Sequence, residues 1–393
     1  MVTITSAQNA LKTVYLDVVS NQLNVGANPL LAKIKHTSSD ILGKEIRKMT
    51  TVGLNGGIGA GSEDGALPAS AGNNYVQFVT TLKNLYGTIE ISDKALRASA
   101  NDASAFVNLL NDEMEGLIKA STFNISRMLY GDGTGKLAAL TAYNNTTKAL
   151  TLDSIKNVME GMVVDIYNND TLVQGGLRIA SVLRGTKQIV LSPTPTTAPV
   201  AGYHLYVQKS KGQELTGLGT LFREIGSIYG IDKVTAYWMT PYVANSVGEI
   251  SDNKIQTAID YLEEISGGQV DFITCSSTVK RAYQQYLSFY KRNFDIVELA
   301  GGVKALSFAG IPVVSDRFAP DDSMYLLDTK EFAMHQLGDW NWLEDDSGKI
   351  IRQVPGFATY SATLVKYADL ICNRPNAQAK LAGISASVTN PFA

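Results

Sequence analysis

The chain has 393 residues, more than one hydrophobic core usually supports, so we expect two or three packed units. Its formal net charge is −3, which argues against nucleic-acid binding as the main task, because such proteins carry a basic excess. Cys275 and Cys372 are too far apart for a zinc ribbon or a disulfide framework, so we expect two buried, reduced thiols. No stretch has the pattern of a signal peptide or the ~20 apolar residues of a membrane span, which favours a cytosol-like compartment.

The N-terminal segment predicts a short amphipathic helix. Ser6 can cap its first turn, and apolar side chains from residues 7–19 share one face. Asn28 and Pro29 then break the chain. A helix this small must bury its apolar face against something else.

A long glycine-rich loop separates the first two predicted strands, which span residues 46–54 and 77–91. The loop, residues 53–72, is too long for an ordinary hairpin turn. Loops of more than ~12 to 15 residues without structure of their own are usually functional or disordered. We interpret this one as an arm that becomes ordered against a partner, and a plain flexible surface loop is the alternative.

Residues 102–133 predict a long helix closed by glycines. Asp102 can cap its N-terminus, and Arg127 lies in the last turn, where a cation complements the helix dipole. Gly131, Gly133 and Gly135 then stop it. Such a helix spans roughly 40 Å at ~1.5 Å per residue, a length that suggests a strut. Its apolar stripe, spaced by three or four residues or by twice that, consists of Phe106, Leu110, Met114, Leu117, Ile125 and Met128.

The sequence pattern of the next part, residues 150–215, is typical of a compact β module. Short β-rich runs alternate with turn residues and a proline-rich stretch. Their close spacing fits a small barrel, and a loose sheet is the alternative. The predicted strands are residues 162–167, 177–183, 187–191 and 203–207.

Beyond residue 217 the pattern becomes α/β, with a sheet flanked by helices. The predicted helices are residues 221–228, 254–265 and 277–290, the second ended by Gly267 and the third capped by Ser277. The predicted strands are residues 270–274, 311–314, 325–327 and 332–336, followed by 359–371 and 379–384 with no helix between them.

Residues 130–136 superficially match a phosphate-binding loop. A true P-loop has four residues between its two glycines and a Ser or Thr after the lysine, whereas Leu137 follows Lys136 here. The stretch also follows a helix, and the anion-binding geometry requires a strand that leads into a helix. We therefore interpret it as the stop of the long helix.

The other residues that could bind a metal or take part in catalysis are better explained as structural residues. His36, His204 and His335 lie in separate segments without ligands at metal-binding spacing, so each is expected to be a surface or packed residue. The acidic run at residues 344–346 fits a solvated turn better than a calcium loop. The sequence predicts no catalytic, cofactor-binding or metal-binding residues.

Residues 280–294 interleave basic and aromatic side chains, a composition that can bind nucleic acid. On a helix, however, these positions put the charges at the edges of one packed stripe. A core or subunit contact is therefore the favoured interpretation. The stripe would consist of Val279, Tyr283, Tyr286 and Tyr290.

Taken together, these parts resemble the major capsid proteins of tailed bacteriophages, of the Hong Kong 97 type. The likeness covers most of the chain except residues 150–215, which look like the insertion domains that some of these proteins carry. The motifs that carry it are, in chain order, Leu54-Asn-Gly-Gly-Ile-Gly-Ala60, Ala66-Leu-Pro68, Leu85-Tyr-Gly-Thr-Ile-Glu-Ile-Ser92, Met128-Leu-Tyr-Gly-Asp-Gly-Thr-Gly135 and Phe308-Ala-Gly-Ile-Pro-Val-Val-Ser315.

The resemblance implies an α+β, Hong Kong 97-like capsid fold with an inserted small β-barrel-like domain. Such subunits form pentamers and hexamers that close into an icosahedral shell around double-stranded DNA. The implied division is an N-terminal arm (1–44), an extended hairpin loop (45–100), a peripheral domain with the spine helix (101–149), the inserted domain (150–215), a connector (216–233), an axial domain (234–336) and peripheral return strands (337–393).

The partners implied are further copies of the chain, a portal and packaged DNA held by weak, non-specific contacts, without a membrane. Residues 53–74 hold no lysine for a crosslink, and the chain begins almost directly with its arm, so we expect neither crosslinking nor a removable scaffolding segment. A separate scaffolding protein is expected if one is used. The expected location is the virion, assembled in the bacterial host cytoplasm. The expected inter-subunit contacts are Gly56, Gly57, Leu67, Pro68, Tyr75 and Tyr86.

Three alternatives stay open at this point. The same fold serves encapsulin compartments. A soluble α/β enzyme would need a pocket with convergent titratable groups, which the sequence does not display. A DNA-binding module centred on residues 280–294 would show a steep salt dependence of DNA affinity.

Overall fold

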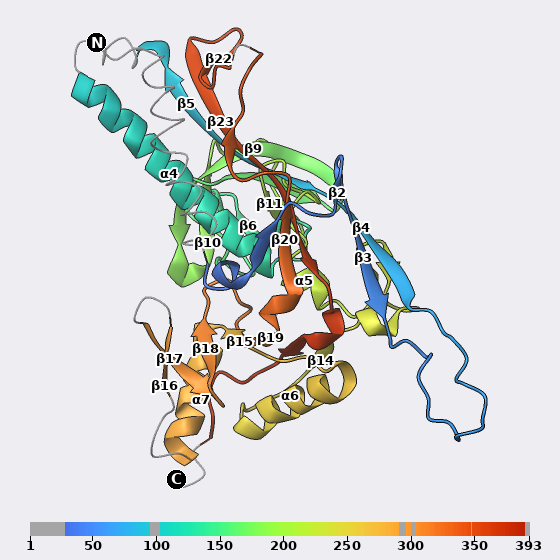
Figure 1. The fold of residues 1–393 in the computed structure, drawn as a ribbon. Coiled ribbons are helices and arrows are strands. Elements are labelled where there is room, and N and C mark those ends of the chain that lie inside the picture. The colour runs from blue at the N-terminus through green and yellow to red at the C-terminus, as the bar shows by residue number, and fades with distance from the viewer. Residues whose placement is uncertain (1–27, 95–102, 291–295, 300–302, 347, 390–393) are drawn as a thin grey trace.

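A long helix, α4 (Ala103–Tyr130), crosses the molecule diagonally in the computed structural model (Figure 1). The structure describes residues 28–94, 103–290, 296–299, 303–346 and 348–389. The predicted N-terminal helix and the Asp102 cap lie outside them, as do the side chains of Phe106 and Leu110. Of the predicted stripe, Met114, Ile125 and Met128 are buried and Leu117 is half-buried. The 28 residues of α4 confirm the predicted strut.

The main sheet lies against α4. Its strand β5 (Lys83–Ser92) alternates buried and exposed side chains, and Leu85, Ile89 and Ile91 face the core. This alternation is typical of a strand with one packed face. Among the described residues the sheet consists of β1 (Lys35–Thr37), β20 (Phe332–Gln336), β23 (Thr359–Cys372) and β21 (Asn341–Trp342) in that order, with β22 (Arg352–Gln353) and β5 also paired to β23.

A separate hairpin is formed by β3 (Glu45–Val52) and β4 (Asn74–Thr81), paired from Glu45↔Thr81 to Val52↔Asn74, with β2 (Ile41–Leu42) at its base. The single strand predicted over residues 77–91 is therefore wrong. The strand is interrupted at Leu82, whose side chain is buried and whose N–H donates to the Lys44 carbonyl at 3.0 Å. Before this break β4 pairs with β3, and beyond it β5 pairs with β23 in the main sheet.

A closed barrel follows α4 and confirms the barrel interpretation of the β module. In the order β10-β7-β6-β11-β8-β9 it joins β6 (Lys136–Asn144), β7 (Ala149–Leu152), β8 (Val163–Asn168), β9 (Thr171–Leu183), β10 (Gln188–Ser192) and β11 (His204–Val207). β6 precedes the boundary expected at residue 150 and belongs to the barrel, because Gly133 and Gly135, with φ of 76° and 82°, turn the chain directly from α4 into it.

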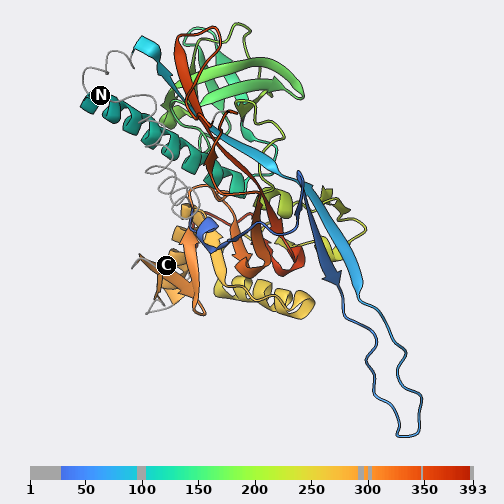
Figure 2. The same ribbon diagram turned by 45° about the horizontal axis from the view of Figure 1, so that its top comes forward.

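The second sheet packs against helices α6 (Asp252–Ser266) and α7 (Ser277–Tyr290). Figure 2 shows this sheet and the barrel at opposite ends of the body, with the main sheet between them. Within the described residues its order is β14 (Tyr242–Ala244), β24 (Ala379–Leu381), β19 (Met324–Leu327), β15 (Phe272–Cys275), β18 (Ile311–Ser315), β17 (Val303–Phe308) and β16 (Ile296–Leu299).

Two strands lie in a different sheet from the one that the expected domain boundaries assign to them. β20 was expected in the axial domain, but it pairs with β1 and β23 in the main sheet. β24 was expected among the peripheral strands, but it lies between β14 and β19 in the second sheet. Pairing between strands that are far apart in sequence depends on tertiary packing, which local sequence patterns do not predict.

The helix ends are set by local chemistry. The Ser251 hydroxyl accepts from the Lys254 amide at the start of α6, and Gly267 ends the helix with a φ of 63°. α7 is capped one residue earlier than predicted, because the Ser276 hydroxyl accepts from the Val279 amide at 3.1 Å. The helix predicted over residues 221–228 is wrong. The segment holds α5 (Leu218–Leu221) and then β12 (Ser227–Ile228), which pairs with β13 (Ile231–Asp232).

Short 3-10 turns complete the described elements. They are η3 (Leu31–Lys33), η4 (Arg184–Thr186), η5 (Tyr237–Met239), η6 (Thr329–Glu331) and η7 (Pro375–Ala377).

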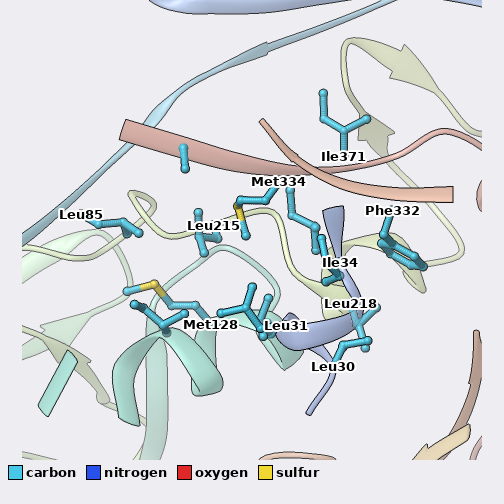
Figure 3. Packing of buried hydrophobic residues seen from close by; sticks show 14 of the residues in the cluster. Leu30, Leu31, Ile34, Leu85, Met128, Leu215, Leu218, Phe332, Met334 and Ile371 are labelled. Carbon is cyan, nitrogen blue, oxygen red and sulfur yellow. The ribbon is translucent and has the colours of Figure 1, made fainter. Parts of the chain in front are cut away.

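The largest core cluster joins the start of the described chain to α4 and the main sheet (Figure 3). Leu30, Leu31 and Ile34 pack among Met128 of α4 and Met334 of β20. The first described residues of the predicted arm, 30–34, therefore contribute to the core. Separate clusters fill the barrel and the second sheet.

Gly217→Ala should destabilise the chain, because a Cβ at Gly217 would lie 2.3 Å from the Met128 carbonyl oxygen and 2.5 Å from that of Gly131. Backbone atoms cannot rotate away, so we expect a loss of about 1–3 kcal/mol in urea unfolding, as for other overpacked sites. Gly338→Ala is the matched control, since nothing lies within 4 Å of its Cβ position. Equal stability of the two variants would contradict the close approach.

Candidate functional site: a projecting hairpin and its anchors

The β3–β4 hairpin and its loop, residues 53–73, extend well beyond the rest of the body (Figures 1 and 2). Leu54, Ile58 and Leu67 in this loop are 93%, 83% and 90% exposed. Single exposed apolar residues are common on protein surfaces, but several of them on one projecting loop make it the candidate contact surface of the described chain.

Most of the predicted contact residues lie on this hairpin. Gly56, Gly57, Leu67 and Pro68 belong to the loop, and Tyr75 lies on β4 next to it. Gly56, Leu67, Pro68 and Tyr75 are exposed and Gly57 is half-buried, and the structure brings the five together on one projecting element.

Local contacts shape the loop. The Gly57 N–H donates to the Asn55 side-chain oxygen at 2.8 Å, which closes a tight turn. A Cβ at Gly59 would lie 3.2 Å from the Pro68 ring, so the two arms of the loop approach each other there. Glycine at residue 59 permits this approach.

Tyr86 lies elsewhere. It is on the exposed face of β5 in the main sheet, where its ring meets that of Tyr367 edge to face at 6.5 Å between centroids. The sequence grouped it with the hairpin because residues 77–91 were expected to form one strand. The break at Leu82 separates Tyr75, on β4 of the hairpin, from Tyr86, on β5 of the main sheet.

Asp369 anchors the base of the hairpin. Its buried carboxylate accepts from the Thr80 hydroxyl of β4 at 3.0 Å, from the amide and hydroxyl of Thr216 at 2.8 and 2.9 Å, and from the Leu370 amide at 2.9 Å. Burial raises the pKa of Asp369, and the bonds from Thr216 and Thr80 oppose that shift. One side chain of β23 therefore holds the hairpin and the segment that follows the barrel.

Aromatic packing supports the same base. The Phe78 ring of β4 stacks on Trp238 at 6.2 Å between centroids and lies 5.4 Å from that of Tyr229. The Tyr229 hydroxyl donates to the Leu370 carbonyl at 3.1 Å and accepts from the Cys372 amide at 3.0 Å. The hairpin thus extends from a well-packed base.

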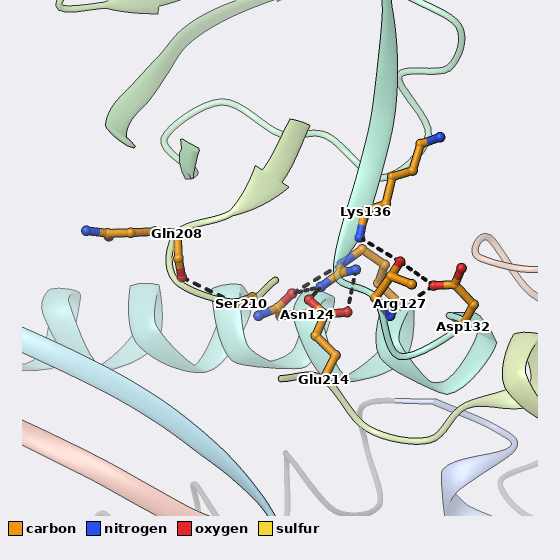
Figure 4. A network of polar contacts seen from close by, with 8 residues as sticks. Asn124, Arg127, Asp132, Lys136, Gln208, Ser210 and Glu214 are labelled. Atoms are coloured by element: carbon orange, nitrogen blue, oxygen red, sulfur yellow. Dashed lines mark hydrogen bonds and ion pairs between the residues drawn. The ribbon is translucent and has the colours of Figure 1, made fainter. Parts of the chain in front are cut away.

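A buried ion pair joins α4 to the end of the barrel segment (Figure 4). The Arg127 guanidinium donates through Nη1 to Glu214 Oε2 at 2.9 Å, through Nη2 to Glu214 Oε1, and through Nε to Asn124 Oδ1 at 3.2 Å. The side chains of Arg127 and Glu214 are 3% and 2% exposed. Two parallel bonds in a dry site fix the geometry of both partners.

In the glycine-rich stretch after α4, backbone amides bond to side chains of the same stretch. The Thr134 amide donates to Asp132 Oδ1 at 3.0 Å and the Lys136 amide donates to the Thr134 hydroxyl at 3.3 Å (Figure 4). The amides of Thr134 and Lys136 are therefore already paired within the stretch. This arrangement agrees with the sequence-based rejection of a phosphate loop.

The groups considered for chemistry pack as expected. His335 is fully buried, and Cys275 and Cys372 are buried free thiols whose pKa values are raised by burial. Among the described residues no group of three or more His, Cys, Asp or Glu side chains could hold a metal ion.

Two segments considered as binding sites also have structural roles. Val279 and Tyr283 of α7 are buried and Tyr286 is half-buried, as the packed stripe predicted, whereas Tyr290 is exposed. The acidic run forms a turn in which the Lys349 amide donates to Asp345 Oδ1 at 2.7 Å.

A second hairpin, between β22 and β23, escaped the sequence analysis. It points away from the 53–73 loop (Figure 1), and Phe357 at its turn is 67% exposed. Pro355 and Gly356, the latter with a φ of 83°, form the turn. A Pro-Gly pair before an aromatic residue was the available signal.

The fold is that of the capsid proteins of tailed phages, the Hong Kong 97-type α and β fold, as the sequence predicted. One chain of the cyanophage A-1(L) capsid asymmetric unit matches with a TM-score of 0.56 and 13% identity, covering 93% of this chain and 94% of that chain. No protein-family model and no curated protein sequence matches.

Two other solved structures match less closely. The holo-SrpI encapsulin of Synechococcus elongatus PCC 7942 matches with a TM-score of 0.46 and 10% identity, over 96% of this chain and 98% of that chain. The procapsid of satellite phage P4 matches with a TM-score of 0.44 and 10% identity, over 95% and 99%.

Proposed function

We propose that the chain is the major capsid protein of a tailed phage, a subunit that assembles into pentamers and hexamers and closes an icosahedral shell around double-stranded DNA. The observation that carries the proposal is the hairpin loop, whose exposed Leu54, Ile58 and Leu67 extend away from the body. The fold shared over nearly the whole chain with a cyanophage capsid chain supports it.

In this proposal the hairpin reaches over a neighbouring subunit, and the second sheet with α6 and α7 lies towards the centre of each capsomer. The barrel is the inserted domain. The main partners are other copies of the chain, and a portal, a separate scaffolding protein and weakly held DNA are further partners. The protein acts in the virion, after assembly in the host cytoplasm.

The role is structural. In the described part of the chain there is no metal-binding cluster, and no helix is long and apolar enough to cross a membrane. An assembly function relies on surfaces such as the hairpin and requires no reaction centre.

Electron microscopy of the purified full chain, expressed alone and with the neighbouring reading frames, tests the proposal. We expect closed shells of uniform size in at least one of the two preparations. DNA inside shells made during infection would identify a capsid, and an enclosed protein cargo would identify an encapsulin-like compartment. Persistent monomers that turn over a substrate would refute both.

A further inference from the structure

Residues 28–42 tie the base of the hairpin to the main sheet. Leu30, Leu31 and Ile34 are buried in the largest core cluster, and Asn28 Nδ2 donates to the buried Asp316 carboxylate at 2.5 Å. After this anchor, β1 runs parallel to β20 along the edge of the main sheet. The chain then enters β2, which pairs with β3 at the hairpin base.

β1 is the weak part of this connection. It has three residues, it lies at the end of the strand order, and its pairing with β20 runs only from Lys35↔Ala333 to Thr37↔His335. Short edge strands contribute few hydrogen bonds and open before the strands at the centre of a sheet.

Two histidines lie across this weak pairing. His36 Nδ1 on β1 is 3.1 Å from Gln336 Oε1, and His335 Nδ1 on β20 is 3.0 Å from the carbonyl oxygen of Ser39. A carbonyl oxygen only accepts, so Nδ1 of His335 carries a proton. The Nε2 atom of His335 is buried without a hydrogen-bond partner. A second proton on this ring would therefore create a buried, unpaired N–H in a charged group.

The charges around the two rings are of both signs. Lys366 of β23 disfavours a proton on His36, and Asp339 favours one. Lys48 of β3 disfavours a proton on His335, and Asp40 favours one.

Burial is the largest influence on both rings, and it lowers the pKa of each. The folded chain therefore binds fewer protons here than the unfolded chain does. The resulting stability is fully present above the ordinary histidine pKa of about 6.5 and is lost as the pH falls below that value.

We propose that His36 and His335 form an acid-sensitive pin, in which protonation of the two rings opens β1 from β20 and loosens the segment that connects β1 to β2. Opening brings water to both rings and separates them from Lys366 and Lys48. The anchoring side chains of Leu30, Leu31 and Ile34 do not titrate and stay in the core, whereas Asp316, which accepts from Asn28, is a carboxyl whose pKa is raised by burial. Acid thus loosens residues 35–42 while the fold persists.

Amide hydrogen exchange of the full chain, corrected for intrinsic rates, tests the pin at about pH 7.5 and about pH 5, on either side of the histidine pKa. We expect protection of residues 35–42 to fall severalfold at the lower pH, while that of α6 is retained. The double variant His36→Asn/His335→Asn keeps a donor near each Nδ1 position but cannot titrate. Its protection over residues 35–42 should not change between the two pH values.

His204→Asn is the matched control, because His204 lies on β11 of the barrel and is the remaining histidine of the chain. It should reproduce the pH dependence of the parent. A parent whose β1 keeps its protection at about pH 5 would overturn the proposal, and so would a double variant that loses protection like the parent.

A second measurement covers the case of a double variant that does not fold. Nuclear magnetic resonance of the parent follows the ring protons of each histidine. The proposal requires His36 and His335 to titrate below the ordinary value of about 6.5, together with the loss of β1 protection. Titration at or above that value would refute it. Neither measurement depends on shell assembly, so the pin and the proposed function can fail separately.

Discussion

A chain in which residues 53–73 are replaced by a two-residue Asn-Gly turn should fold normally and form no closed shells. Val52 and Asn74 are directly paired, so a two-residue turn can join β3 to β4 without changing their register. The loop contributes no residue to the core clusters of the described chain, so its removal should leave the melting temperature nearly unchanged. Circular dichroism and electron microscopy of the same preparation measure both properties.

Point variants separate the apolar side chains of the loop from its length. Serine at three exposed apolar positions of the loop should abolish shells, and serine at three exposed apolar positions of the barrel should not. The loop set is Leu54→Ser, Ile58→Ser and Leu67→Ser, and the barrel set is Leu172→Ser, Leu183→Ser and Val200→Ser. Normal shells from the loop set or from the shortened chain would refute the role of the hairpin in assembly.

Glu214→Ala should be among the most destabilising single substitutions in the chain. It leaves the Arg127 guanidinium buried without its carboxylate, and breaking a buried ion pair in this way costs about 3–5 kcal/mol. Against a total stability of about 5–15 kcal/mol, many molecules would be unfolded at moderate temperature. Urea unfolding followed by tryptophan fluorescence gives the difference, which should appear in the midpoint at an unchanged slope.

The double variant Arg127→Met/Glu214→Leu provides the control. It removes both charges and fills a similar volume, so it should recover much of the stability that the single variant loses. Glu115→Ala breaks an exposed pair with Lys119 and should leave the midpoint unchanged. A Glu214→Ala chain that unfolds like the parent would show that water or another group compensates Arg127.

Local sequence patterns correctly predicted the elements that depend mainly on local signals. The stripe of α4, the Gly267 stop of α6 and the long strand β23 all follow from periodicity and from single punctuating residues. The break at Leu82, where pairing changes from β3 to β23, could not be predicted, because no glycine or proline marks it. The hydrogen bond to the Lys44 carbonyl and the burial of Leu82 at this break are both tertiary contacts.

In the candidate site, too, local features were predicted and features that depend on tertiary contacts were not. The length and glycine content of residues 53–72 predicted a separate arm, whereas the sequence did not show that Tyr86 lies on a different element from the hairpin, because the break before β5 has no local signal. Arg127 was interpreted as a cation at a helix end, whereas its main partner is Glu214, 87 positions later. This ion pair forms because the chain returns from the barrel to α4. The spacing of the two residues in the sequence does not predict it.

The barrel begins and ends at almost the same place. The chain leaves α4 for β6 near Gly131 and returns from β11 to α5 near Gly217, and there the Gly219 amide donates to the Gly131 carbonyl at 3.0 Å while the Gly212 amide donates to the Thr134 carbonyl at 2.8 Å. Segments whose two ends are adjacent can be lengthened, shortened or exchanged with little strain on the rest of a fold. The barrel can therefore be replaced by another domain at this point, in evolution or by engineering, while the course of α4 is unchanged.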